Sequence, residues 1–269
     1  MSVCDVQLQP PLAQRGKKSR PDESGSAFQH VLLSTGNIAQ TATRTTTGSR
    51  DELLQSLEHT LTSSTPIQLQ EPNSNVPILT IGNTTSSDIL AEDRTDLDIT
   101  IKLFIPSHPT PSHVHQTLTH LTTSLQTTTI DTVIVYWPAS SSSLLKLLPL
   151  WRELERYVKE GKIANLGVSG FTGADQLRAW NQLVEIKPTK VQVRTEAGTL
   201  RVAPEIMKLS LTEGFELYLD TDPDDILSHR TLQRVTDIHS LPVVIHPSWI
   251  ARYQVVVKTR QVLLSRGYV

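Results

Sequence analysis

The chain has 269 residues, and its 25 Lys and Arg side chains nearly balance 27 Asp and Glu side chains, giving a formal net charge of −2. This length can bury the core of one large domain. The charge balance excludes a protein that coats duplex nucleic acid, because phosphate contacts need a clear cationic surplus. Apolar runs are interrupted by Lys, Ser or Pro well before the roughly 18 residues that a membrane span needs. We therefore expect neither a nucleic acid nor a membrane as a partner.

The cysteine content and the first residues indicate the compartment. The chain has one cysteine, Cys4, which excludes an internal disulfide framework and a multi-thiolate metal cluster. The first segment lacks the charged stretch followed by an apolar one that marks a secretory signal. These features predict a cytoplasmic protein.

Residues 1–28 are rich in Pro, Gly, Ser, Lys and Arg and poor in large apolar side chains. Such a segment has too few apolar groups to offset the entropy lost on ordering. We therefore predict a disordered tail over 1–28 and a single domain over 29–269. The basic run 15–20 fits a solvated tail, with an import signal or an anion contact as alternatives.

The first periodic segment begins at Ser49. Leucines at helical spacing behind Ser49 and Asp51 predict a helix, and they are Leu53, Leu54, Leu57 and Leu61. Residues 62–96 are polar and rich in Thr and Ser, with one strand candidate at 76–81.

A strand is predicted at 98–105, where Pro106 ends it. Thr110 and Pro111 then open a helix, because Pro at the first helical position loses no hydrogen bond. The apolar stripe of this helix consists of Val114, Leu118, Leu121 and Leu125.

The following hundred residues alternate between β-branched runs and amphipathic segments. The predicted strands are 132–137, 163–169, 191–193 and 215–219. The predicted helices are 147–158, a segment that starts at a capping box formed by Thr172 and Asp175, and 204–212. The region after Pro223 is also expected to be helical, and the last short apolar run is 255–257.

Strands that alternate with helices predict a parallel sheet, because only a crossover returns the chain in the same direction. The 241 residues beyond the tail match the typical size of an eight-fold β/α barrel. We therefore predict an α/β fold of the TIM-barrel type, (β/α)8. The first strands are weakly marked in the sequence, which indicates a barrel that is incomplete or irregular there.

Four segments resemble the aldo-keto reductase barrel, in the order and spacing of that family. They are Ile99-Thr-Ile-Lys102-Leu, Ile130-Asp-Thr-Val-Ile-Val-Tyr136-Trp137-Pro138, Gly161-Lys-Ile163 leading to Leu166-Gly167-Val168-Ser169, and Val191-Gln192-Val193. The segments 33–38, 150–158, 252–260 and 266–268 are similar to one branch of it, the modifier (regulatory, light) subunits of glutamate–cysteine ligase. The resemblance implies a reductase-like barrel that forms a heterodimer with the catalytic subunit of the ligase in glutathione biosynthesis.

Reductase chemistry of this type uses a Tyr as general acid, a Lys that lowers its pKa, an Asp that holds the Lys and a His that orients the carbonyl. Lys102 matches the Lys position, but no tyrosine precedes it, and Tyr136 stands where the resemblance places a His. We find no upstream Asp partner for Lys102. We therefore predict no catalytic residue and no enzyme activity, with Lys102 and Tyr136 as a vestigial pocket. The alternative is that Tyr136 has taken over the acid role.

Cofactor and metal signals are weak in this sequence. Gly167, Gly170 and Gly173 do not form the dinucleotide fingerprint, and Lys258 matches the 2′-phosphate loop of the reductases only in part. We therefore predict no cofactor, with a retained NADPH site as the alternative. Neither the histidines, which are His108, His113, His115 and His120, nor the aspartates, which are Asp220, Asp222, Asp224 and Asp225, complete a metal site. The aspartate pair after Pro223 is expected to stabilise a helix N-terminus.

Three functional hypotheses follow. The first is a non-catalytic regulatory subunit that binds and activates the catalytic subunit of glutamate–cysteine ligase. The second is an NADPH-dependent aldo-keto reductase acting on small carbonyl compounds, and the third is a barrel that binds NADPH without turnover and senses redox state. The expected partner contact lies in the C-terminal segment, at Arg252, Lys258, Arg260 and Tyr268. The alternative is that this segment closes the barrel.

Overall fold

The computed structural model describes residues 2–7, 30–39, 48–63, 67–70, 77–82, 93–105, 110–138, 144–194, 202–239 and 244–269. Its strands are β1 (Ser2–Gln7), β2 (His30–Ser34), β3 (Ile67–Gln70), β4 (Pro77–Gly82), β5 (Leu97–Phe104), β6 (Ile130–Tyr136), β7 (Ile163–Phe171), β8 (Lys190–Arg194), β9 (Glu216–Asp220), β10 (Val244–Val257) and β11 (Val262–Tyr268). Its α-helices are α1 (Ser49–Ser63), α2 (Pro111–Ser124), α3 (Leu148–Lys159), α4 (Ala174–Leu183), α5 (Pro204–Glu213) and α6 (His229–Ile238). Two short 3-10 helices, η2 (Arg94–Asp96) and η3 (Leu144–Lys146), precede β5 and α3.

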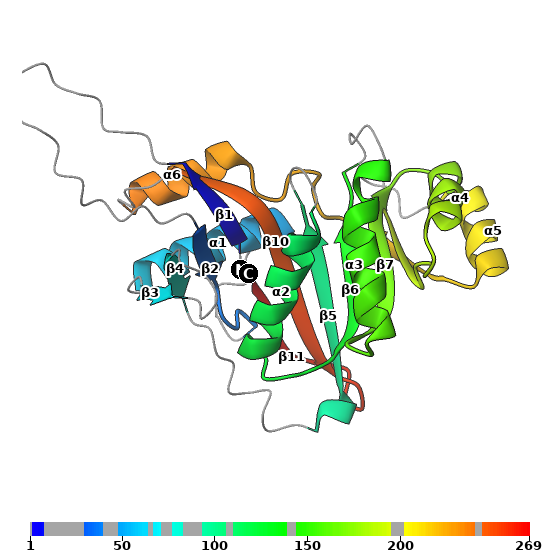
Figure 1. The fold of residues 1–269 in the computed structure, drawn as a ribbon, viewed down its shortest axis with the longest axis horizontal. Helices are drawn as coiled ribbons and strands as arrows, with labels where there is room; N and C mark the ends of the chain where they lie inside the picture. Colours follow the sequence, from blue (N-terminus) through cyan, green and yellow to red (C-terminus); the bar gives the residue numbers. More distant parts are fainter. Residues whose placement is uncertain are drawn as a thin grey trace, which may run out of the picture.

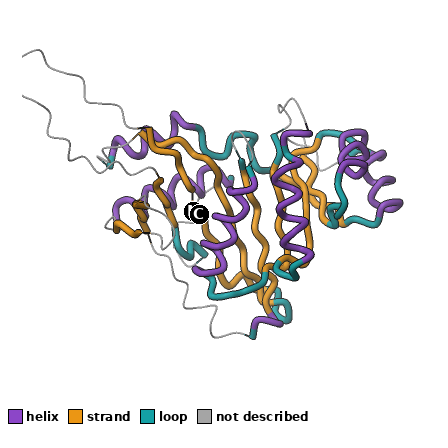
Figure 2. The backbone as a smooth tube through the Cα atoms, in the orientation of Figure 1, coloured by secondary structure: helices purple, strands orange, loops and turns teal. Residues whose placement is uncertain are grey.

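A curled mixed sheet forms the centre of the fold (Figure 1). Strands β5, β6, β7, β8 and β9 are parallel neighbours in chain order. The long strand β10 pairs antiparallel with β5, and β11 pairs antiparallel with β10. Figure 2 shows helices over one face of the parallel strands. The predicted α/β class is thus confirmed, and the barrel is incomplete.

The last part of the chain differs most from the sequence prediction. Only the short run 255–257 was expected to be apolar structure, whereas β10 and β11 together form an antiparallel pair that continues the sheet. Their pairing joins segments far apart in sequence, which local periodicity does not reveal. The predicted helix after Pro223 begins only at His229, with Ser228 as its N-cap.

Strands β1 to β4 extend the sheet beyond β10. Strand β1 lies within the segment expected to be a disordered tail, and pairs antiparallel with β10 on one side and with β2 on the other. Backbone hydrogen bonds to two neighbours order this segment despite its composition. Residues 8–29 lie outside the described residues, and the single domain over 29–269 stays a prediction.

Helix boundaries in the parallel region follow from the sequence. Thr110 is the N-cap of α2 and Pro111 its first residue, as predicted. Helix α5 ends at Gly214, whose φ of 78° is the left-handed conformation that glycine adopts most readily. The capping box predicted at Thr172 is wrong, because Gly173 is the N-cap of α4 and the Thr172 amide donates to the side chain of Gln176.

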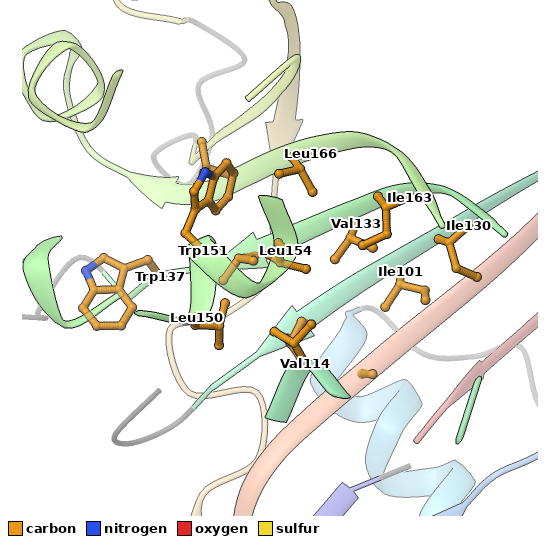
Figure 3. Packing of buried hydrophobic residues seen from close by; sticks show 14 of the residues in the cluster. Ile101, Val114, Ile130, Val133, Trp137, Leu150, Trp151, Leu154, Ile163 and Leu166 are labelled. Atoms are coloured by element: carbon orange, nitrogen blue, oxygen red, sulfur yellow. The ribbon is translucent and has the colours of Figure 1, made fainter. Parts of the chain in front are cut away.

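The main core lies between the parallel strands and the helices that cover them (Figure 3). Alternate residues of the strands, such as Ile101 and Val133, point toward the buried side chains of α3, such as Leu154. The indole rings of Trp151 and Trp180 pack edge to face, with centroids 5.3 Å apart. All four tryptophans, Trp137, Trp151, Trp180 and Trp249, are buried. They therefore serve packing rather than an exposed interface. In the described part of the chain, no helix combines the length and apolar character needed to cross a bilayer.

Replacement of Leu154 by Ala should test this core. Leu154 is fully buried between α3 and the sheet, so the Leu154→Ala variant should lose about 2–5 kcal/mol of unfolding free energy through lost burial and a residual cavity. Urea denaturation measures the change. The control is Leu145→Ala in η3, where the side chain is largely exposed and little change is expected. Equal losses in the two variants would contradict the packing described here.

Candidate functional site

A buried charge cluster lies where the ends of β5, β7 and β9 meet. Lys102 of β5 is only 3% exposed, and its Nζ atom lies 2.8 Å from Oδ2 of Asp220 and 2.7 Å from Oδ2 of Asp222. Asp220 is the last residue of β9, and Asp222 follows it in the loop. Lys102 therefore has two carboxylate partners across the interior of the curled sheet.

Arg252 supplies the second cation of this cluster. It is paired with Lys102 in the register of β10 and β5, and its two terminal nitrogens each lie 2.8 Å from an oxygen of Asp222. Such a bidentate contact fixes both side chains. Ser169 of β7 donates to Asp220, and the Asp222 amide also donates to Asp220, over 3.0 Å. Two cations and two carboxylates thus balance one another; we name these four residues the charge cluster.

The electrostatics of the charge cluster are set by burial and pairing. Burial alone would raise the pKa of Asp222, but the cations of Arg252 and Lys102 hold it well below its usual range. Burial lowers the pKa of Lys102, while Asp220 and Asp222 oppose this shift. The carboxylate of Asp222 is thus ionised and structural.

A second set of polar contacts lies beside the charge cluster and involves α1. Burial raises the pKa of Tyr268, and its hydroxyl donates to Oε1 of Glu52 in α1 over 2.7 Å. Arg266 forms an ion pair of 3.0 Å with the same carboxylate. Tyr268 also lies opposite Arg252 in the pairing of β11 with β10. These contacts tie α1 and β11 to the charge cluster.

Tyr136 lies beside the charge cluster, at the end of β6. Its hydroxyl donates to Oδ1 of Asp224 over 2.6 Å, and Asp224 is paired with Arg194 at 2.6 Å. Burial and the hydrogen bond to Asp224 raise the pKa of Tyr136 above its usual value. The Nζ atom of Lys102 lies 5.4 Å from the centroid of the Tyr136 ring, over its face. The phenol is therefore protonated, and its proton is directed at a carboxylate.

A pocket of about 200 Å³ adjoins Tyr136. It is lined by Phe104, Ile105, Tyr136, Pro138, Asp224, Asp225, Ile226 and Leu227. These residues come from the ends of β5 and β6 and from the loop that leads to α6. Its position matches the catalytic end of β/α barrels, where the loops after the strands form the site.

The structure brings Lys102 and Tyr136 together, as expected for a pocket at one end of neighbouring strands. The carboxylates that hold these two side chains were not predicted from the sequence. The aspartate pair after Pro223, which is Asp224 and Asp225, does not lie at a helix N-terminus, since α6 begins at His229 with Ser228 as its N-cap and Asp224 pairs with Arg194. Asp220 could have been predicted as a site residue, because it follows a predicted strand and a carboxylate at the end of a barrel strand lies at the catalytic end.

The four residues predicted as a partner contact do not gather at one surface. At one end of the pair β10–β11, Tyr268 is buried and the side chain of Arg252 is only 13% exposed, and their polar groups contact Glu52 and Asp222. Their side chains are therefore not available to a partner. Lys258 and Arg260 are exposed in the turn at the other end of this pair. A partner contact at these two residues stays a prediction.

Lys258 does not fit the role of a nucleotide-phosphate ligand beside this pocket. Its amide donates to Asp96 and its Nζ atom to Thr95, both at the start of β5, whereas the pocket lies at the end of β5. The eight residues of β5 span roughly 25 Å at about 3.3 Å per residue. The part of the fold that is described thus offers no Lys258 contact to a dinucleotide placed at Tyr136.

Among the described residues, no group of three or more His, Cys, Asp or Glu side chains is arranged to hold a metal ion. His120 in α2 is mostly buried and lies 3.0 Å from the hydroxyl of Ser124, and burial lowers its pKa to about 3. His115 contacts the hydroxyl of Tyr157 at 2.9 Å. Both histidines thus take part in packing contacts of α2 and α3.

Removal of Lys102 should destabilise the protein strongly. Lys102→Met leaves two buried carboxylates with Arg252 as the remaining cation, which should cost about 3–5 kcal/mol of unfolding free energy. Urea denaturation at pH 7 gives the value. Lys159→Met is the matched control, since it removes a lysine from an exposed ion pair with Glu185 and should have no measurable effect. A loss equal to that of the control would mean that the charge cluster contributes nothing to stability.

The low pKa of Asp222 predicts a loss of stability in acid. Because the folded-state pKa lies below the unfolded value of about 3.9, the unfolded state binds more protons below pH 4. The contribution of Asp222 is therefore complete above pH 4 and lost as pH falls through the folded-state value. Denaturation midpoints between pH 6 and pH 2.5 measure this dependence. The Asp222→Asn variant, which lacks the titrating group, should show a shallower dependence, and equal slopes would refute the assignment.

Comparisons with known proteins support the resemblance seen in the sequence. The chain is 28% identical over 187 residues to the glutamate–cysteine ligase regulatory subunit of Homo sapiens, covering 66% of this chain and 67% of that protein. It is 30% identical over 125 residues to the NAD(P)H-dependent D-xylose reductase of Scheffersomyces stipitis, covering 37% of this chain and 38% of that protein. The aldose reductase structure from Giardia lamblia shares 22% identity, with a TM-score of 0.40 over 55% of each chain. The model of the Aldo/keto reductase family matches residues 80–218, which is just over half of the sequence, and the chain therefore belongs to the aldo/keto reductase family.

Proposed function

We propose that this protein is a non-catalytic regulatory subunit that binds and activates the catalytic subunit of glutamate–cysteine ligase in glutathione biosynthesis. The likeness to the human regulatory subunit extends across about two thirds of each chain, and it supports this role. The partner would bind as a second polypeptide in a heterodimer. The one cysteine of the chain, Cys4, lies in β1, which is paired with a strand on each side, and we therefore expect this complex to be noncovalent and insensitive to reductant.

The observation that carries the non-catalytic part of the proposal is the environment of Tyr136. A reductase of this family needs a lysine that lowers the pKa of a tyrosine, so that the phenol gives its proton to a carbonyl oxygen. Here Lys102 is paired with two carboxylates, Asp220 and Asp222, where the reductase chemistry uses one, and Asp224 accepts a hydrogen bond from the Tyr136 hydroxyl. The pKa of Tyr136 moves upward, which is opposite to the direction that catalysis requires.

Activation without chemistry is explained by differential binding. A regulatory subunit that binds the productive conformation of the catalytic subunit more tightly than the others increases the population of that conformation. The rate then rises although the regulatory subunit contributes no reacting group. The charge cluster would serve this function by keeping the curled sheet rigid, so that little order has to be gained on binding.

A second candidate function is an NADPH-dependent aldo-keto reductase acting on small carbonyl compounds. It is favoured by the family and by the pocket of about 200 Å³ that opens beside Tyr136. In this case Tyr136 would be the acid, and its bond to Asp224 would have to break when the substrate binds.

The regulatory role predicts a measurable complex. The purified chain, titrated into a glutamate–cysteine ligase catalytic subunit, should form a one-to-one heterodimer, lower the KM for glutamate and relieve inhibition by glutathione. Size-exclusion chromatography and ligase kinetics measure both effects. Repetition in the presence of reductant should leave them unchanged. No complex at micromolar concentration would refute the proposal.

The two candidate functions make opposite predictions for Tyr136. In the regulatory role, the wild-type chain should consume no NADPH with aldehydes, and Tyr136→Phe should activate the ligase as well as wild type. In the reductase role, wild type should bind NADPH with fluorescence quenching and turn over aldehydes, and Tyr136→Phe should abolish turnover. Substrate-dependent NADPH oxidation that disappears in Tyr136→Phe would therefore replace the first proposal with the second.

A further inference from the structure

Strand β9 is an edge of the curled sheet. It pairs in parallel with β8, and no other strand of the described chain pairs with it. The Glu216 amide donates to Thr189 beside β8. Because the bonding residues alternate along a parallel strand, the amides and carbonyls of Leu217 and Leu219 point away from β8. In the described structure, these groups face an edge that another extended backbone can complete.

Another edge of the same sheet is covered. Strand β11, which pairs only with β10 among the described strands, is covered along the half that ends at Tyr268 by residues 35–38. The Thr35 amide donates to Tyr268 over 3.1 Å, and the Ile38 amide donates to Arg266 over 2.7 Å. Covering of this kind is how natural proteins protect sheet edges from other chains. Within the described residues, β9 has no such cover.

Apolar side chains gather at the β9 edge. Tyr218 and Leu219 of β9 are 43% and 42% exposed. The neighbouring helix α5, whose buried residues are Ile206 and Leu209, lies at the outer end of the layer of helices, next to α4 (Figure 1). An open strand edge that carries exposed apolar side chains matches a surface that takes up another chain by strand addition.

The interior face of β9 carries negative charge. Tyr218 donates a hydrogen bond to Glu216, and this contact together with burial and the charge of Asp98 raises the pKa of Tyr218 to about 12. Asp98, which comes from β5, thus acts on the same region. Its Oδ1 atom is buried and has no hydrogen-bond partner in the described residues. Two carboxylates at this face favour a cationic side chain in the segment that pairs with β9.

The same charges disfavour a second copy of this chain as the occupant. Strand β9 contains no Lys or Arg, so a second β9 strand would bring no cation to face Glu216 and Asp98. Its own Glu216 would add a further negative charge, and like charges close together destabilise a strand pair. The acidic edge therefore selects a strand of different composition.

We propose that the β9 edge binds an extended segment of another polypeptide by strand addition. In that segment, an apolar side chain would contact Leu219 on the helix side of the sheet, and an alternating Lys or Arg would face Glu216 and Asp98 on the interior side. This inference rests on the proposed function, in which the segment belongs to the catalytic subunit of glutamate–cysteine ligase. It adds the surface and the mode of contact.

Amide exchange tests the strand addition directly. Hydrogen–deuterium exchange of the full chain, alone and with the ligase catalytic subunit, should show at least ten-fold slower exchange at the amides of Leu217 and Leu219 in the complex. The exposed turn that carries Lys258 and Arg260 serves as the internal reference. Unchanged exchange at Leu217 and Leu219 in a formed complex would overturn the inference.

Substitutions separate the edge from the rest of the surface. Leu219→Lys and Glu216→Lys add a cation where an apolar and basic segment is expected, and should each raise the Kd for the catalytic subunit at least ten-fold. Ile238→Lys is the matched control, because Ile238 is 70% exposed on α6, away from β9. It should change the Kd by less than two-fold. Circular dichroism confirms folding, and Glu216→Lys keeps the test valid if Leu219→Lys does not fold.

The outcomes distinguish this inference from the function on which it rests. No binding of wild type to the catalytic subunit refutes both. Normal binding of wild type, with both variants equal to Ile238→Lys, refutes the β9 edge and leaves the regulatory role intact. Slow exchange at Leu217 and Leu219 in the isolated chain would assign the edge to another segment of the chain itself. A dimer of wild type that Leu219→Lys dissociates would assign the edge to a second copy. Either result also overturns the inference.

Discussion

The ion pairs of Lys102 with Asp220 and Asp222 join two strands that are not neighbours in the sheet. Lys102 lies on β5 and Asp220 ends β9, with β6, β7 and β8 between them. The contact therefore crosses the interior, and it forms only when the parallel strands curl. Removing these charges from water costs several kcal/mol per ion, which is offset only when every partner, including Arg252, is in place. The curl of the sheet and the balance of the buried charges thus depend on each other.

The same ion pairs decide what the pocket can do. A lysine that is shared by two carboxylates lowers the pKa of a neighbouring phenol less than a lysine held by one, and Tyr136 is further stabilised in its protonated form by Asp224. The chain belongs to a family of reductases and keeps its parallel strands and a pocket at their ends. The geometry of its polar groups serves stability, and this is the physical basis for proposing association with another protein as the function.

Because the barrel is incomplete, its sheet has strand edges. A closed barrel has no strand edges, whereas in the described chain this sheet has edges at β3, β9 and β11. Residues 35–38 cover part of β11, and their bonds to Arg266 and Tyr268 join that edge to the region of the charge cluster. Strand β9 ends in Asp220, so that an additional strand bound there would lie directly beside the residues that hold Lys102. Binding at the edge and rigidity of the interior are therefore linked by position.

Local sequence patterns determined much of the parallel region. Leucine spacing, β-branched runs and a proline at position 111 specify helices and strands because each depends on neighbours within a few residues. The closeness of Lys102 and Tyr136 also follows, since the ends of adjacent parallel strands meet. Only the tertiary structure decided the pairing of β10 with β5 and the partners of Lys102, because Lys102 and Asp220 are separated by 118 residues. From the sequence alone, polar side chains such as Arg252 and Tyr268 are expected at the surface. They are instead largely removed from solvent, and the folded chain brings Asp222 and Glu52 to their polar groups.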